Sequence, residues 1–167
     1  ELKPVTSANR IPQLVEGKID IVAATMTKTP DRAKQVEFSN TYFFTVQTFI
    51  AKKRTVQSLA DLDGKTIGTS KGSTSEQNAK KALPKSNILA FDDYPQASLA
   101  LEQGKVFAVT TDESILVNLL RTMPDKDKYE IPDVQISDEP YGLGIRKGDK
   151  AFVAFVNEAL QGDVGHG

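Results

Sequence analysis

Short runs of apolar residues alternate with amphipathic segments along most of the chain. The runs at residues 66–69, 87–91 and 106–110 are rich in Ile, Val, Ala and Thr, which is typical of buried strands. Between them, apolar residues recur three and four positions apart, which is the spacing of one helix face. Strands that alternate with helices predict an α/β fold with a mainly parallel sheet.

The expected elements cover nearly the whole chain. Strands or strand ends are predicted at residues 1–6, 19–24, 36–39, 42–53, 66–69, 87–91, 106–110, 129–131 and 140–146. Helices are predicted from Ser7 to Gly17, from Pro30 to Gln35, at 58–65, from 73 to about 83, from Pro95 to Gly104, after Asp112, and near the end of the chain. The first helix is expected to have Ala8, Ile11, Leu14 and Val15 on one face. The last helix is expected to have Phe152, Phe155, Val156 and Leu160 on one face.

The order of these elements predicts two lobes. Residues 48–138 contain their own series of strands and helices and form the expected second lobe. The flanks, residues 1–42 with 143–167, form a partial first lobe. Residues 43–47 and 139–142 are the expected hinge crossings, because the strand at 42–53 is longer than a strand mode of about 5–6 residues.

Composition and charge exclude several classes of function. The 167 residues are 39% hydrophobic with a net charge of −1, which gives no electrostatic reason to expect a nucleic-acid partner. There is no cysteine, and the single histidine is His166. Thiol catalysis and cysteine–zinc sites are therefore excluded, and a Ser-His-Asp triad or multi-histidine metal site is disfavoured. We expect no metal, no cofactor and no catalytic residue.

The most informative polar segment follows the apolar run at 19–24. Thr29 is the expected N-cap of a short helix, and Pro30 suits its first position because the missing N–H costs nothing there. Thr25, Thr27 and Arg32 would then converge beyond the carboxyl end of a strand, where open α/β sheets bind ligands. A guanidinium matches a carboxylate bidentately. The alternative is a solvated helix start with a surface arginine.

An ordered set of motifs resembles a known family. The segments are NRIP (9–12), EGKID (16–20), TMTKTPDRAK (25–34), VEFS (36–39), LADLDGK (59–65) and GST (72–74). Together they resemble the polar amino-acid-binding family of periplasmic solute-binding proteins of ABC transporters, whose fold recurs in the ligand cores of ionotropic glutamate receptors. The resemblance implies a two-lobe periplasmic-binding-protein-like fold of type II, with one lobe complete and one partial.

In the first lobe, the resemblance assigns a carboxylate clamp. Thr27 and Arg32 match the residues that hold the ligand's α-carboxylate in the family. Thr25 stands where the family often has Gly or Ser, and its backbone or hydroxyl would meet the α-amino group.

In the second lobe, the resemblance assigns donors and an acid. Ser73 and Thr74 match a loop that reaches the same carboxylate, in agreement with the donors and partial positive charge at a helix N-terminus. Asp112 matches the residue that pairs with the ligand ammonium, and Ser70 is a further candidate. The alternatives are a capping box between Ser73 and Glu76, and an N-cap at Asp112.

Specificity is expected from a third group of residues. Ser7 and Arg10 resemble the serine and arginine that contact the side-chain carboxylate in the glutamate/aspartate-binding branch. Tyr94 falls at another side-chain contact of that branch, although a histidine is expected there. The alternative for Arg10 is an exposed helix arginine.

Two departures from the family affect the expected assembly. The family's opening strand–helix–strand is missing before Glu1, and residues 161–167 end a helix that usually continues past Leu160. An unpaired sheet edge and an uncovered apolar face would follow, and both favour self-association. We expect a homo-oligomer, as a dimer swapped through residues 42–53 and 140–146.

The expected function is binding, not catalysis. The chain is predicted to be an extracytoplasmic protein, periplasmic or at the cell surface, that binds an L-amino acid, glutamate or aspartate first, for a membrane permease of an ABC transporter. A sensing or self-assembling module of the same fold is the first alternative. A dehydratase with Glu113 as its general acid is the second.

Overall fold

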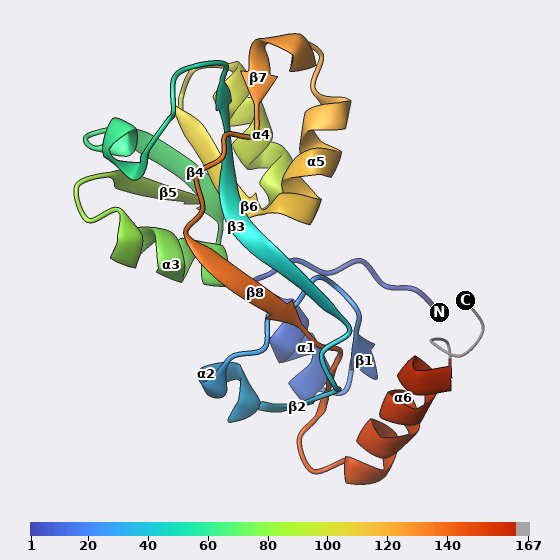
Figure 1. Cartoon of the computed structure of the whole chain (residues 1–167). Helices are drawn as coiled ribbons and strands as arrows, with labels where there is room; N and C mark the ends of the chain where they lie inside the picture. The colour runs from blue at the N-terminus through green and yellow to red at the C-terminus, as the bar shows by residue number, and fades with distance from the viewer. Residues whose placement is uncertain (163–167) are drawn as a thin grey trace. The chain divides into compact units, whose positions relative to one another are not determined.

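The chain folds into two compact units. The computed structural model describes residues 1–162. Unit 1 comprises Glu1–Phe44 and Glu139–Gly167, and unit 2 comprises Thr45–Asp138. The chain passes between the units twice, within strand β3 (Phe43–Lys52) and within strand β8 (Ser137–Tyr141), and these two strands pair (Figure 1). The predicted hinge role of residues 43–47 and 139–142 stays a prediction.

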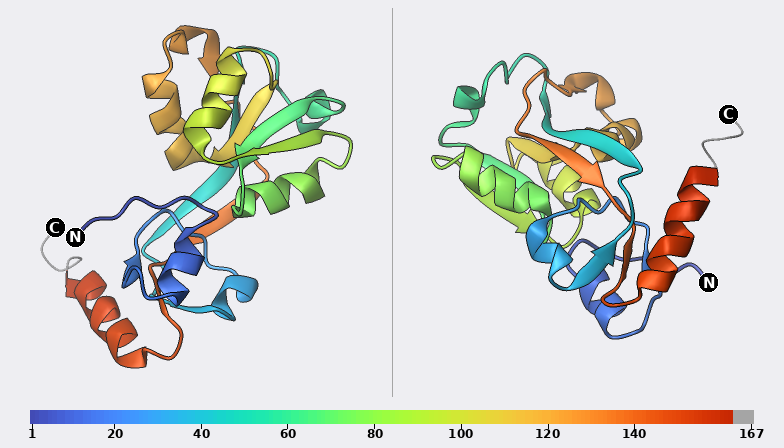
Figure 2. Two further views of the ribbon diagram at one scale, coloured as in Figure 1. Left: turned by 180° about the vertical axis from the view of Figure 1, so that it is seen from behind. Right: turned by 60° about the horizontal axis from the view of Figure 1, so that its bottom comes forward.

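Unit 1 is built on a small antiparallel sheet. Its strands are β1 (Ile21–Val22), β2 (Val36–Phe38) and β9 (Gly144–Arg146), and β9 lies between the other two. Its helices are α1 (Arg10–Val15), α2 (Pro30–Ala33) and α6 (Lys150–Gly162). Helix α6 packs along β2 (Figure 2), where the backbone N–H of Asn40 donates to Asn157 Oδ1 at 2.7 Å.

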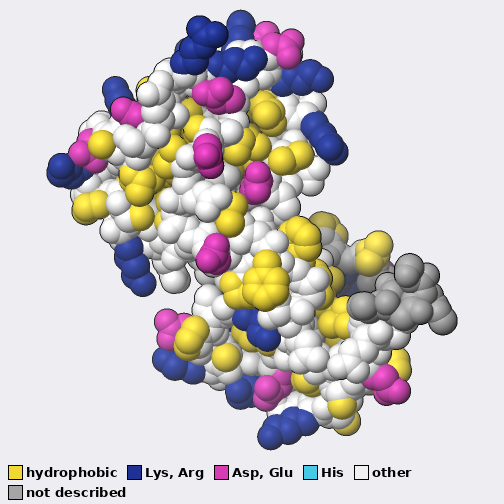
Figure 3. Space-filling model, viewed as in Figure 1, with side chains coloured by type: hydrophobic (Ala, Val, Ile, Leu, Met, Phe, Trp, Pro, Cys, Tyr) yellow, Lys and Arg dark blue, Asp and Glu magenta, His cyan; other side chains and the backbone are white. Residues whose placement is uncertain are grey.

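The core of unit 1 is small, and much of its apolar surface is exposed. Four buried hydrophobic side chains form one cluster: Leu14, Val22, Met26 and Val36. Of the eight large hydrophobic side chains that are exposed among the described residues, six belong to this unit: Leu2, Val15, Tyr42, Phe43, Phe44 and Phe155. Hydrophobic side chains form a patch on the face of unit 1 that Figure 3 shows.

Unit 2 is built on a larger mixed sheet. Its further strands are β4 (Thr66–Ser70), β5 (Asn87–Phe91), β6 (Ala108–Asp112) and β7 (Tyr129–Glu130), in the order β5-β4-β6-β3-β7. Strand β4 runs parallel to β5 and β6, whereas β3 is antiparallel to β6 and β7. The carboxyl ends of β4, β5 and β6 therefore lie at one edge.

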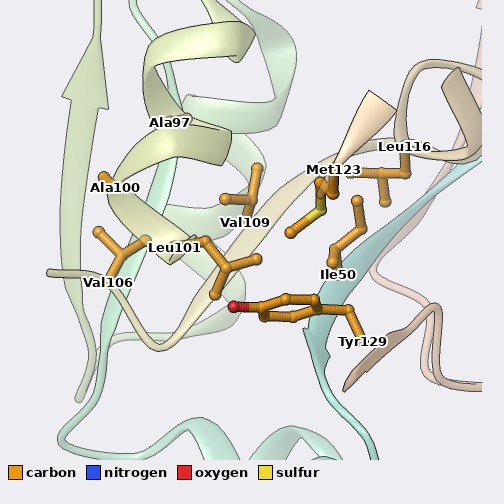
Figure 4. Packing of buried hydrophobic residues seen from close by; sticks show 9 residues of the cluster. All are labelled: Ile50, Ala97, Ala100, Leu101, Val106, Val109, Leu116, Met123 and Tyr129. Atoms are coloured by element: carbon orange, nitrogen blue, oxygen red, sulfur yellow. The ribbon is translucent and has the colours of Figure 1, made fainter. Parts of the chain in front are cut away.

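Helices cover both faces of this sheet. They are α3 (Thr74–Ala82), α4 (Tyr94–Glu102) and α5 (Glu113–Thr122), with short 3-10 turns η1 (Leu59–Leu62) and η2 (Lys126–Lys128). Ile50 of β3 packs with Leu101 and Leu116 on the face that α4 and α5 cover (Figure 4). Its neighbour Phe49 packs with Leu62 on the other face. Successive residues of β3 thus serve two separate cores.

Several predicted elements are confirmed, and others are wrong. Strand β5 has the predicted bounds, and β3, β4, α3 and α4 lie where they are expected. Residues 1–6 form no strand, and the apolar run at 19–24 pairs only at β1. The predicted strand at 140–146 divides into the end of β8 and the whole of β9. The prediction of a mainly parallel sheet holds only for β4, β5 and β6, because β3 is antiparallel to its neighbours β6 and β7 and both strand pairs of unit 1 are antiparallel.

Two helices of unit 1 differ from their predicted faces. Helix α1 begins at Arg10 rather than after Ser7. The backbone N–H of Thr6 donates to Asn9 Oδ1, and the backbone N–H of Asn9 donates to Thr6 Oγ1, so that a turn precedes the helix. Val15 and Phe155, which were placed on buried faces, are 57% and 65% exposed. Helix α6 continues past Leu160 to Gly162, and the predicted helix end beyond that residue lies outside the described residues.

Among residues 1–162, no helix is long and apolar enough to cross a bilayer.

Candidate ligand-binding site

The threonine-rich loop of unit 1 has the predicted helix start. Thr29 is the N-cap of α2, and its Oγ1 accepts a hydrogen bond from the backbone N–H of Arg32 at 3.2 Å. Pro30 occupies the first turn, as expected. Thr25 is exposed and has a φ of +44°, a left-handed conformation that is uncommon for a β-branched residue.

Arg32 and Thr27 lie together in this loop. Both are buried, with 9% and 5% of their surface exposed. Arg32 Nη1 donates to the carbonyl oxygen of Thr27 at 2.8 Å. Thr27 also forms an isolated β-bridge with Tyr141, and the next residue donates its N–H to the Pro140 carbonyl at 2.8 Å. The structure thus brings the predicted clamp residues into direct contact within unit 1.

Arg10 is buried, which differs from the alternative of an exposed helix arginine. Only 4% of its surface is exposed, and its Nη1 donates to the carbonyl oxygens of Ala24 at 2.6 Å and Thr25 at 3.5 Å. The guanidinium therefore holds the start of the threonine loop. Its predicted role in ligand specificity stays a prediction, as does that of Ser7, which is half-buried in the turn before α1.

An aromatic group lies near Arg10. Tyr42 is exposed over 42% of its surface, and the partial desolvation of its phenol raises the pKa above its ordinary value, because it disfavours the charged phenolate. The positive charge of Arg10 acts in the opposite direction. The Tyr42 and Tyr141 rings lie 6.4 Å apart between centroids. Unit 1 thus combines a basic loop anchor with aromatic side chains.

In unit 2, the predicted residues gather at one edge of the sheet. Ser70 ends β4, Asp112 ends β6, and Tyr94 opens the helix after β5. Because these three strands are parallel neighbours, their carboxyl ends meet at this edge. Ser70 and Asp112 are buried, and Tyr94 is half-buried.

Ser73 caps the helix that begins at this edge. Its Oγ accepts from the Glu76 N–H at 3.1 Å and donates to the Ser70 carbonyl at 2.7 Å. The Glu76 carboxylate accepts from the Gly72 N–H at 3.1 Å, instead of from the N–H of Ser73 as in a strict capping box. The first turn of α3, which begins at Thr74, presents N–H groups that a helix cannot satisfy internally. This arrangement suits an anion.

Asp112 is the N-cap residue of α5, the position that the alternative gave it. Its side chain makes no capping hydrogen bond, so capping does not account for this carboxylate. Only 4% of its surface is exposed. An ionised carboxylate accepts hydrogen bonds only, and an ammonium group is its natural partner.

Sequence patterns alone did not single out a set of polar residues behind this edge. Five of them are buried, namely Gln47, Thr48, Ser75, Thr110 and Thr111, and two are half-buried, namely Asn78 and Ser137. The available signal was Gln47, a lone amide in a strand of mainly aromatic and β-branched residues. Among residues 1–162, no cluster of acidic, histidine or cysteine side chains has the arrangement of a metal site.

The fold and the polar groups of each unit define a class of protein. Two α/β units joined by two crossing strands, with polar groups at strand ends, make a type II periplasmic-binding-protein-like fold. The chain belongs to family 3 of the bacterial extracellular solute-binding proteins, whose sequence profile matches residues 1–162.

Individual relatives agree with this assignment. The chain is 43% identical over 154 residues to a glutamine-binding protein of Geobacillus stearothermophilus, and the match covers 91% of this chain and 58% of the relative. An ancestral arginine-binding protein bound to glutamine superposes with a TM-score of 0.92 at 38% identity, over 99% of this chain and 74% of that one. The ancestral amino-acid-binding protein AncCDT-1, a precursor of cyclohexadienyl dehydratase, superposes with a TM-score of 0.90 at 33% identity. This match covers 99% of this chain and 72% of that one. The chain thus spans 58% of the length of the Geobacillus relative.

Proposed function

We propose that this chain binds the charged head of an L-α-amino acid, outside the cytoplasm, for uptake through the membrane permease of an ABC transporter. The observation that carries the proposal is the carboxyl edge of the unit 2 sheet. It places the first turn of α3, which suits a carboxylate, beside the strand end that bears Asp112, which suits an ammonium. An α-amino acid carries these two charges on one carbon.

The roles of the residues follow from their chemistry. Ser73 and Thr74 supply donors to the carboxylate from α3, with Ser70 behind them, and Asp112 receives the ammonium. In unit 1, Arg32 beside Thr27 is a candidate contact for a ligand carboxylate, and Thr25 is a candidate contact for an α-amino group. Tyr94, half-buried at the first position of α4, is a candidate contact for the ligand side chain.

The proposed ligand is glutamine first, then arginine, glutamate and aspartate. A glutamine-binding protein is among the similar curated relatives, and the ancestral protein with a TM-score of 0.92 was solved with glutamine. Glutamate and aspartate were expected on the strength of Arg10. In the structure Arg10 Nη1 bonds the Ala24 carbonyl, and this contact weakens the case for an acidic ligand.

A thermal-shift panel of the twenty amino acids tests the proposal. A ligand at about 100 times its Kd adds roughly 2.7 kcal/mol of stability. For a chain of this size, that raises the Tm by about 5–10 °C. Absence of a shift of even one degree with every amino acid at millimolar concentration contradicts binding by this chain.

A matched pair of variants tests the ammonium site. Asp112→Asn keeps the shape but removes the charge, and removing one partner of a buried charged pair costs roughly 2–5 kcal/mol, or at least about 30-fold in Kd. Asp92→Asn is the control, because Asp92 follows β5 at the same edge but is exposed and pairs with Lys71 at 3.0 Å. Equal effects of the two substitutions, measured by calorimetric titration, remove Asp112 from the site.

The dehydratase alternative depends on Glu113. This residue opens α5 and is exposed, whereas a general acid is usually held in a desolvated cleft. Incubation with prephenate-like substrates tests the alternative directly, since any turnover that Glu113→Gln abolishes supports an enzyme.

We also propose that the chain self-associates through unit 1, with the swapped dimer as the expected form. Among residues 1–162, strand β1 is an edge strand that pairs only with β9, and an open groove of about 450 Å³ runs beside it between residues 1–5 and 18–24. Six exposed large hydrophobic side chains belong to the same unit. A second copy would cover the strand edge and the apolar surface together.

Light scattering at micromolar concentration tests self-association. The expected mass is twice the 18.2 kDa of one chain. Phe155→Glu should shift the equilibrium toward the monomer. Leu99→Glu should leave it unchanged, because Leu99 is also exposed, at 52%, but lies in unit 2. A monomeric wild-type chain contradicts the proposal.

A further inference from the structure

Gln47 is a polar side chain in the core-facing part of strand β3. It is fully buried, with 0% of its surface exposed. Its Nε2 donates to the Ser75 carbonyl at 3.1 Å and to Thr110 Oγ1 at 3.1 Å, and its Oε1 accepts from Asn78 Nδ2 at 3.0 Å. One side chain therefore ties helix α3, through two of its residues, to strands β3 and β6.

The bonds around Gln47 extend through unit 2. Thr110 Oγ1 donates to the Thr48 carbonyl oxygen at 2.8 Å, and Ser75 Oγ donates to Thr111 Oγ1 at 3.2 Å. Asn78 Nδ2 also donates to Ser137 Oγ at 3.1 Å. Helix α3 is thus bonded to both strands that leave unit 2, to β3 through Gln47 and to β8 through Ser137.

This polar network contrasts with the rest of unit 2. Elsewhere the sheet faces are filled by two apolar clusters, whose hydrophobic stabilisation is not directional. The hydrogen bonds of a buried amide are directional. When all of them are made, they fix the relative positions of the groups that the amide joins. Here the joined groups include Ser75, the second residue of α3, directly after Ser73 and Thr74.

We propose that Gln47 is a positioning residue. It holds the first turn of α3 against the crossing strands β3 and β8, so that the donors at Ser73 and Thr74 are in place before the ligand carboxylate arrives. The inference rests on the proposed amino-acid binding, and it adds that the affinity depends on a residue placed behind the binding edge. Pre-positioned donors raise affinity because less ordering remains to be done on binding.

The test compares two buried substitutions in one strand. Gln47→Met keeps the approximate volume and removes every hydrogen bond of the amide. Ile50→Val is the control, because Ile50 also lies in β3 and is buried, but packs on the opposite face, with α4 and α5. Titration calorimetry with L-glutamine, or with the amino acid that gives the largest thermal shift, measures the Kd. NMR reports the amide shifts of Ser73 and Thr74 without ligand.

The expected result is a Kd at least tenfold weaker in Gln47→Met, with moved or broadened Ser73 and Thr74 amide signals. Ile50→Val should stay within twofold of the wild-type Kd, with both signals unmoved. A folded Gln47→Met protein with the wild-type Kd overturns the inference. So does an equal loss of affinity in both variants, which would indicate general destabilisation.

Two further outcomes are distinguishable. If Gln47→Met does not fold, Asn78→Ala replaces it, because Asn78 is half-buried and its loss removes the bonds to Gln47 Oε1 and Ser137. If the wild-type chain binds no amino acid, the proposed function fails. The positioning role is then decided by the NMR signals alone, and unmoved Ser73 and Thr74 amides overturn it.

Discussion

The two units hold their polar loops in different ways. Unit 2 supports the polar carboxyl edge of its sheet with apolar clusters on both sheet faces and with the hydrogen bonds of Gln47. Unit 1 has one small cluster, and its threonine loop is held by two guanidiniums, Arg10 and Arg32, that donate to loop carbonyls. A loop can therefore be fixed either by the core beneath it or by charged side chains that satisfy its backbone.

The difference between the units has a consequence for stability. Unit 1 leaves six large hydrophobic side chains exposed, and its strands have two or three residues each apart from the crossing strands. Short strands and a small core provide few cooperative contacts. We therefore expect unit 1 to open at a lower free energy than unit 2.

The largest expected effect is the loss of folding stability when a buried side chain is truncated, and it distinguishes the core of unit 2 from that of unit 1. Phe49→Ala in unit 2 should cost about 3–5 kcal/mol, and Leu14→Ala in unit 1 about 2–5 kcal/mol, because both side chains are fully buried. Hydrogen exchange should show that Leu14→Ala releases the amides of unit 1 and leaves those of unit 2 protected. Equal release in both units would mean that the chain unfolds as one body.

A pair of glycines tests packing in unit 1 against backbone strain in unit 2. A Cβ at Gly144 would lie 2.4 Å from Met26 Cε and 3.3 Å from Val22 Cβ. Gly144→Ala should therefore cost about 1–3 kcal/mol through overpacking. A Cβ at Gly64 would meet no atom within 4 Å, but the backbone φ there is +71°. We therefore expect Gly64→Ala to lower the free energy of unfolding by about 1 kcal/mol through backbone strain.

Urea unfolding of each glycine variant measures these costs. A Gly144→Ala protein as stable as the wild type would show that Met26 can move freely. The core of unit 1 would then be looser than described.

The smallest expected effect is electrostatic and belongs to unit 2. The Asp61 carboxylate accepts from the backbone N–H groups of Gln57 at 2.8 Å and Ser58 at 2.9 Å, and these bonds lower its pKa below the ordinary value of 3.8. A lowered folded-state pKa adds stability above the unfolded-state pKa, and this stability is lost as the pH falls through the folded-state value.

Asp61→Asn should therefore be slightly less stable than the wild type near neutral pH, and the difference should vanish in acid below the lowered pKa. Urea unfolding at several pH values checks this. A difference that stays constant with pH would show that the bonds of Asp61, and not its charge, account for the effect.

Local chemistry is what the sequence determined by itself. Thr29 and Pro30 begin α2, and Ser73 caps α3, because a cap depends on residues within a single turn. The alternation of strands and helices in unit 2 followed from hydrophobic periodicity, because that periodicity also depends on residues close together in the sequence. The order of short motifs pointed to the family, which the match over residues 1–162 then established.

Only the tertiary structure decided which side chains are paired at a distance. Arg10 bonds a carbonyl 14 residues away, and Gln47 joins residues 28 and 63 positions away. Val15 and Phe155 have an apolar character that predicts burial, yet both are exposed in the described residues. Burial and long-range hydrogen bonds depend on what the fold places opposite a residue, and no local pattern contains that information.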